Sequence, residues 1–110
     1  MKIPQLSVAL TVVGLLSTPA LAVDEDAAKA LAKKNDCFKC HAVDKTKKGP
    51  SLKKIAAKYA GKPEGQEKAI KNMTTASKVK LEDGTEEDHK IIDTKDPKEL
   101  KNLADWILSR

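Results

Sequence analysis

Two cysteines three positions apart, followed directly by a histidine, are the residues of this chain with the clearest chemistry. They form the run Cys37-Phe38-Lys39-Cys40-His41. This spacing is typical of a c-type haem attachment site, because each sulfur can form a thioether with one haem vinyl group. The histidine that follows can offer an imidazole nitrogen to the iron as the proximal ligand. The motif therefore predicts one haem c, covalent through Cys37 and Cys40, with His41 on the iron.

Three other uses of the two cysteines fit the sequence less well. A zinc site needs two further cysteine or histidine ligands at matching spacing, and only His41 and His89 remain. A thioredoxin-like dithiol needs a βαβ context, whereas the flanking sequence is rich in alanine and lysine and has a helical pattern. A disulfide between the two cysteines would close a small strained ring and leave His41 unexplained. Haem attachment is the interpretation that uses all three residues.

The first 22 residues have the pattern of a secretory signal peptide. Lys2 gives a positive start, residues 6–16 are mostly apolar, and Ala20-Leu21-Ala22 is a small-x-small cleavage sequence. The apolar run is too short to favour the alternative of an uncleaved membrane anchor, and no later stretch is apolar enough to span a bilayer. The sequence predicts cleavage after Ala22, export to the periplasm, and one mature domain of residues 23–110 without a transmembrane segment.

The mature domain is small and has few large apolar side chains. Its only aromatic residues are Phe38, Tyr59 and Trp106. A domain of this size buries limited apolar area, so a covalent haem would supply much of the core.

Charge is unevenly distributed along the chain. Residues 24–80 hold 15 lysines against seven acidic residues, whereas residues 81–110 hold five basic and nine acidic residues. The lysines that cluster after the haem motif are Lys45, Lys47, Lys48, Lys53, Lys54 and Lys58. They predict transient, salt-sensitive docking onto acidic redox proteins, with a solvated polar surface as the alternative. Aromatic residues do not alternate with these lysines, which argues against nucleic-acid binding.

Hydrophobic periodicity predicts helices on both sides of the motif. A helix begins with the acidic residues 24–26, continues with alanines and a leucine at helical spacing, and ends just before Cys37. Ser51 is the expected N-cap of a second helix that reaches Tyr59. Residues 67–73 form a third, with Met73 facing inward. Residues 74–94 have no firm prediction beyond a turn or small hairpin at residues 82–84.

The last helix has the clearest start signal. Asp96 is an acidic N-cap, Pro97 occupies the first helical position, and Glu99 lies in the first turn. The apolar stripe that follows consists of Leu100, Leu103, Ala104 and Ile107, with Trp106 beside it. This pattern predicts a helix that continues to the C-terminus.

Over its whole mature length the chain resembles the small class I c-type cytochromes of bacteria. The resemblance rests on the attachment motif after an amphipathic helix, on Lys-Gly-Pro-Ser-Leu at residues 48–52, and on residues 55–59 and 103–109. It implies an all-α fold of three to five helices around one haem, with the first and last helices crossing. It also implies that the carbonyl of Pro50 bonds to the ring of His41, which would fix the ring.

The sequence departs from that family at the sixth iron ligand. The family usually places a methionine in the loop before the last helix, and this loop has none. His89 lies 17 residues before Trp106, in that loop, whereas Met73 lies 33 residues before Trp106. We therefore expect His41 and His89 to bind the iron, with Met73 or an open site as alternatives. Otherwise His89 is a solvated loop residue among three acids.

These features predict an electron carrier rather than an enzyme, since neither an acid/base pair nor a nucleophile stands out. The resemblance implies a monomeric periplasmic protein that passes electrons between redox partners, similar to the shuttles of neutral-pH Fe(II)-oxidising bacteria. Two alternatives stay open at this point. One is a haem protein that binds a small gas or peroxide after losing His89 from the iron, and the other is the haem subunit of a larger oxidoreductase.

Overall fold

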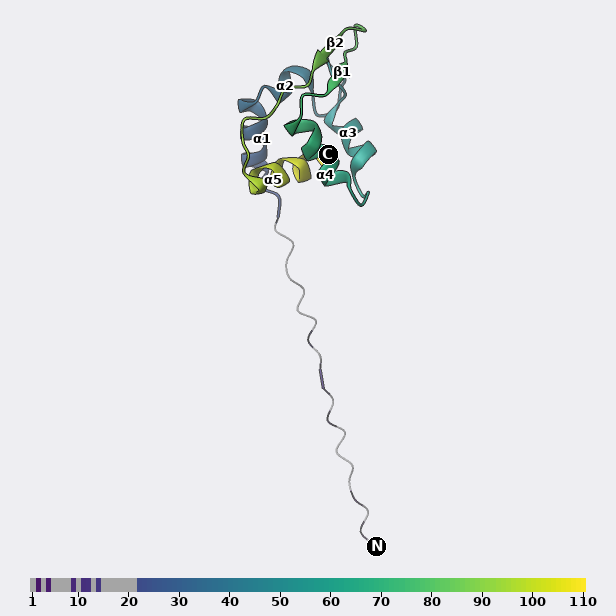
Figure 1. Ribbon diagram of the computed structural model, residues 1–110. Helices are drawn as coiled ribbons and strands as arrows, with labels where there is room; N and C mark the ends of the chain where they lie inside the picture. The colour runs from purple at the N-terminus through teal and green to yellow at the C-terminus, as the bar shows by residue number, and fades with distance from the viewer. Residues whose placement is uncertain (1, 3, 5–8, 10, 13, 15–21) are drawn as a thin grey trace.

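The computed structural model describes residues 22–110 together with residues 2, 4, 9, 11, 12 and 14 (Figure 1). Its elements, in chain order, are α1 (Glu25–Lys34), α2 (Cys37–Cys40), α3 (Leu52–Tyr59), α4 (Gly65–Thr74), β1 (Lys78–Lys80), β2 (Glu86–Asp88) and α5 (Pro97–Leu108). The predicted all-α class is confirmed for this part of the chain. No helix within it is long and apolar enough to cross a bilayer. The predicted signal peptide falls mainly outside the described residues, so cleavage after Ala22 stays a prediction.

The first and last helices pack against each other, as the family resemblance implied. α1 is capped by Asp24, whose carboxylate accepts a hydrogen bond from the Ala27 N–H at 3.0 Å. Ala28 and Ala32 are buried on its inner face, and these small side chains let α5 approach closely. Asn102 of α5 joins the two helices, because its side chain accepts from the Asp24 N–H and donates to the Asp24 carbonyl, both at 2.9 Å.

α5 has the cap that the sequence predicted and a wider buried face. The Asp96 carboxylate accepts from the Lys98 N–H at 2.9 Å, and Pro97 is the first helical residue. Trp106, expected beside the apolar stripe, is 1% exposed, whereas Ile107, expected within it, is only half-buried. The reason is that α1, α3 and α4 all pack against α5. The helix ends two residues before the C-terminus.

α3 and α4 complete the helical core. Ser51 caps α3 as predicted, accepting a hydrogen bond from the Lys54 N–H at 3.1 Å. α4 begins at Gly65, two residues earlier than predicted. A Cβ at Gly65 would collide with the carbonyl oxygen of Tyr59, so the start of α4 needs a residue without a side chain. Met73 is buried in the last turn of α4, as expected.

Residues 74–94 contain a short antiparallel hairpin around the predicted turn. Val79 of β1 lies opposite Glu87 of β2. Gly84 has a φ of 86°, a conformation that glycine adopts at little cost. In Figure 1 the hairpin extends from the helical body at the end where α2 lies. Because β2 leads directly into His89, the hairpin helps to decide where that histidine lies.

Candidate functional site

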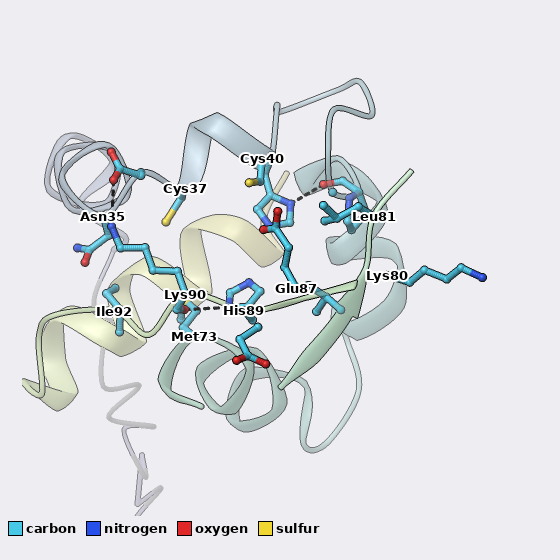
Figure 2. Close-up of a pocket in the computed structure, with 16 residues that line it drawn as sticks. Asn35, Cys37, Cys40, Met73, Lys80, Leu81, Glu87, His89, Lys90 and Ile92 are labelled. Carbon is cyan, nitrogen blue, oxygen red and sulfur yellow. Dashed lines mark hydrogen bonds and ion pairs between the residues drawn. The ribbon is translucent and has the colours of Figure 1, made fainter. Parts of the chain in front are cut away.

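α2 is a single helical turn that holds both cysteines at the edge of one cavity. Asp36, which precedes it, has a φ of 60°, a left-handed conformation that aspartate tolerates better than most residues. Phe38, between the cysteines, packs edge-on against Trp106 of α5 with 6.3 Å between ring centroids. The turn is thus fixed to the helical core, and Figure 2 shows Cys37 and Cys40 side by side above the cavity.

The cavity brings together every residue that the sequence selected for the site. These residues are Cys37, Cys40, His41, Pro50, Met73 and His89. The cavity opens to solvent on one side, and the empty space within it and at its mouth amounts to about 840 Å³. Val79, Leu81 and Ile92 contribute apolar side chains to the lining. Burial raises the pKa of the Cys37 thiol. The lining therefore suits a large apolar group with two points of attachment.

The His41 ring is held from two sides. Its Nδ1 lies 2.6 Å from the carbonyl oxygen of Pro50. Because a carbonyl only accepts hydrogen bonds, Nδ1 donates and Nε2 keeps a free lone pair. Gly49 lies against the ring, since a Cβ at this position would be 2.9 Å from the Cε1 atom of His41. Burial lowers the pKa of His41, and the bond to Pro50 opposes this effect. The ring is therefore oriented and favoured in its neutral, metal-binding form.

His89 enters the same cavity from the hairpin side. Its backbone N–H donates to the carbonyl of Ser77 at 2.8 Å. Its ring Nδ1 lies 2.9 Å from the carbonyl oxygen of Lys90, so Nδ1 is again the donor and Nε2 is free. In Figure 2 the His89 side chain points into the cavity, across from Cys40.

The distance between the His41 and His89 rings is compatible with one metal ion between them. Their centroids are 6.3 Å apart, and their planes are inclined by 40°. Two metal–nitrogen bonds of about 2 Å, each extended by about 1 Å to the ring centre, span the same distance. Each ring has its Nδ1 engaged by a backbone carbonyl, which leaves the same atom free on both sides. Two neutral imidazoles are a donor set that suits iron.

Met73 lines the cavity from α4 and also belongs to the core. It is 9% exposed and packs in the buried cluster that includes Ile92. Its backbone carbonyl accepts a hydrogen bond from the Ile92 N–H at 2.8 Å. Its side chain therefore has a packing role whether or not its sulfur approaches the iron.

Some residues that shape the site have weak signals in the sequence. Glu87 lines the cavity, and it lies two positions before His89, so strand alternation could have placed both side chains on one face. Gly49 precedes Pro50 in the loop of residues 48–52, but its contact with His41 appears only in the structure. Asn35 bonds to the backbone of Asp93 across 58 residues of sequence. No local pattern reveals a contact of that kind.

Comparisons with known sequences identify the family of this chain. The family model for Cytochrome c matches residues 25–110. Cytochrome c-551 of Stutzerimonas stutzeri is 33% identical over 102 residues, which cover 86% of this chain and 85% of that protein. Cytochrome c-552 of Nitrosomonas europaea is 62% identical over 32 residues, a stretch that spans 29% of this chain and 31% of that protein.

Two solved structures share the fold over most of this chain. The class 1 cytochrome MtoD from Sideroxydans lithotrophicus ES-1 superposes with a TM-score of 0.76 and 57% identity, covering 80% of this chain and 97% of MtoD. The structure of Nitrosomonas europaea cytochrome c552 gives a TM-score of 0.59 with 34% identity, covering 74% of this chain and 96% of that one. The attachment motif lies at the edge of the cavity, and the family model, the relatives and the solved structures all point the same way. This chain therefore belongs to the cytochrome c family and is an electron-transfer protein that carries haem c on Cys37 and Cys40.

Proposed function

We propose that this protein is a periplasmic electron carrier whose iron is held between His41 and His89. The observation that carries the proposal is the pair of imidazole rings 6.3 Å apart in one cavity, each with its Nδ1 engaged by a backbone carbonyl. Periplasmic location rests on the signal-peptide pattern of residues 1–22.

Each residue of the site has a distinct task in this proposal. The haem supplies an iron that changes between the ferric and ferrous states. Cys37 and Cys40 keep the group attached while the protein moves between partners. Pro50 orients the His41 ring and, through the bond to Nδ1, makes its imidazole a better ligand. His89 would bind the iron as a second imidazole and so leave no coordination site open to a substrate, which is what a carrier needs.

Electron paramagnetic resonance of the ferric protein tests the ligand pair. The wild-type protein should give a low-spin spectrum, because two imidazoles form a strong ligand field. His89→Ala should convert most of the iron to a high-spin or water-bound form. Met73→Leu preserves the volume of the core and should leave the low-spin spectrum unchanged. If the low-spin spectrum persists in His89→Ala and is lost in Met73→Leu, the sixth ligand is Met73.

Six lysines after the attachment motif offer a docking surface, which we call the proximal lysines. They are Lys45, Lys47, Lys48, Lys53, Lys54 and Lys58. All six are exposed, and none forms an ion pair with another residue in the described part of the chain. The Nζ atom of Lys47 donates to the carbonyl of Phe38 at 2.8 Å, which places one positive charge beside the attachment motif. An acidic partner would dock here through a small, transient interface.

Reversing two of these charges should slow electron transfer with an anionic reagent. We expect Lys45→Glu/Lys48→Glu to lower the second-order rate constant for oxidation by hexacyanoferrate(III) about ten-fold at low ionic strength, and the difference to shrink as salt screens the charges. Stopped-flow absorbance of the reduced protein measures this rate. Lys98→Glu/Lys101→Glu, on exposed positions of α5, makes the same change in net charge and is the matched control. Equal slowing in both variants would mean that net charge matters and the proximal lysines do not.

A further inference from the structure

We infer that Asn35 is a positioning residue that holds His89 against the iron. The inference rests on the proposed function, in which His89 is the sixth ligand. Asn35 lies between the end of α1 and the attachment motif, and it bonds to the segment that carries His89. We call residues 89–93 the distal segment.

The distal segment is tied to the end of α1 by three consecutive residues. The backbone N–H of Asp93 donates to the Oδ1 atom of Asn35 at 2.9 Å. Asp36 pairs with the Nζ atom of Lys90 at 3.0 Å. Lys34 pairs with the Asp93 carboxylate at 3.5 Å. These contacts flank the distal segment on the side of the attachment motif, and Figure 2 shows Asn35 and Lys90 on the same side of the cavity as Cys37.

Asn35 is the strongest of these three ties. It is 4% exposed, and its Nδ2 atom donates to the Leu31 carbonyl at 3.0 Å, so its amide is fixed in direction. Both side-chain atoms of Asn35 are therefore satisfied inside the protein, in a place where an unpaired partner is costly. The two ion pairs are more than two-fifths exposed at each end, and solvent and salt weaken them.

The position of Asn35 explains why it would act on the iron ligand. The chain runs from Asn35 through Asp36 directly into Cys37, so one short stretch fixes both the attached group and the distal segment. The other backbone hydrogen bonds of the distal segment run to the end of α4 and to the residue before β1, from the Ile92 N–H to Met73 and from the His89 N–H to Ser77. Without the Asn35 amide, the Asp93 N–H has no acceptor, and the segment can swing away from the attachment motif. His89 would then leave the iron more often and admit external ligands.

Carbon monoxide binding to the reduced holoprotein tests this inference. In the wild-type protein, binding should be slow because His89 must leave first. Asn35→Ala should accelerate the binding about ten- to a hundred-fold, which is the effect of leaving one buried group unpaired. His89→Ala sets the fastest rate. The matched control is Asn102→Ala, which removes a similar pair of side chain–backbone bonds at the other end of α1. It should lower the thermal stability and leave the binding rate at the wild-type value.

The outcomes separate this inference from the proposed function. If the wild-type protein and His89→Ala bind carbon monoxide equally fast, His89 is not the ligand and both proposals fail. If His89→Ala is fast but Asn35→Ala matches the wild type, only the positioning role is wrong. Should Asn35→Ala not fold, Asn35→Ser decides, because it keeps a small polar side chain but lacks the amide that accepts from the Asp93 N–H, and it should accelerate binding at least about five-fold. An unchanged rate in Asn35→Ser would overturn the inference.

Discussion

The double variant Cys37→Ala/Cys40→Ala should hold no covalent haem and should not form the helical domain. The two sulfurs are the only thiols of the chain, so nothing else can form a thioether. The mass of the purified mature protein should equal that of the bare polypeptide. Far-ultraviolet circular dichroism should show little helix and no cooperative thermal transition at room temperature and above.

The expected loss of the fold follows from the composition of the core. Trp106 and Leu103 are the largest fully buried side chains among the described residues. Alanine is common among the other buried apolar residues, as at Ala28, Ala32 and Ala104. A core of this size supplies no more than about 3–5 kcal/mol in small domains, and a large cavity beside it lowers that figure. We therefore expect the covalent haem to complete this core.

Lys39→Ala is the matched control for the cysteine variant. Lys39 lies between the cysteines, its side chain is exposed, and its ion pair with Asp36 at 3.4 Å contributes little. This variant should keep both the haem mass and the thermal transition of the wild-type protein. A cysteine-free variant that melts cooperatively near the wild-type temperature would show that the helices fold without the haem.

The parts of the fold that the sequence predicted depend on local contacts. Ser51 and Asp96 cap their helices by bonding to N–H groups two or three residues away, so their side-chain chemistry alone is informative. The turn at Gly84 has the same local origin. The burial of Trp106 was less clear, because it depends on three helices that meet at α5. The hydrophobic periodicity of α5 indicates one apolar face, but it does not indicate how many other helices pack against α5.

The candidate site also combines residues that local sequence patterns reveal with residues that they do not reveal. Cys37, Cys40 and His41 are adjacent in the chain, so their spacing alone indicates the chemistry. His89 was placed by its distance from Trp106 and by the lack of a methionine in its loop. The residues that fix the direction of the ligands act through backbone groups far away in sequence, as Asn35 does on Asp93. Such contacts need the path of the chain in space.

Replacing His89 with methionine should raise the reduction potential by on the order of 0.1 V. A thioether favours ferrous iron more than a second imidazole does, so the reduced form gains stability. Methionine is long and flexible enough to reach the iron from the same backbone position, which His89 holds by its N–H bond to Ser77 at 2.8 Å. Potentiometric titration followed by optical absorbance measures the shift, and a low-spin ferric spectrum checks that the methionine has bound.

A second variant, Met73→Leu, lets the measured reduction potential distinguish His89 from Met73 as the iron ligand. If His89 binds the iron, Met73→Leu alters only packing in the core, so the potential should stay close to the wild-type value. If Met73 binds the iron instead, His89→Met should leave the potential nearly unchanged, and Met73→Leu should remove the ligand and shift it strongly. The two assignments therefore predict opposite patterns in the same pair of proteins. Because both side chains line one cavity, the change in potential can be attributed to the ligand rather than to a different environment of the iron.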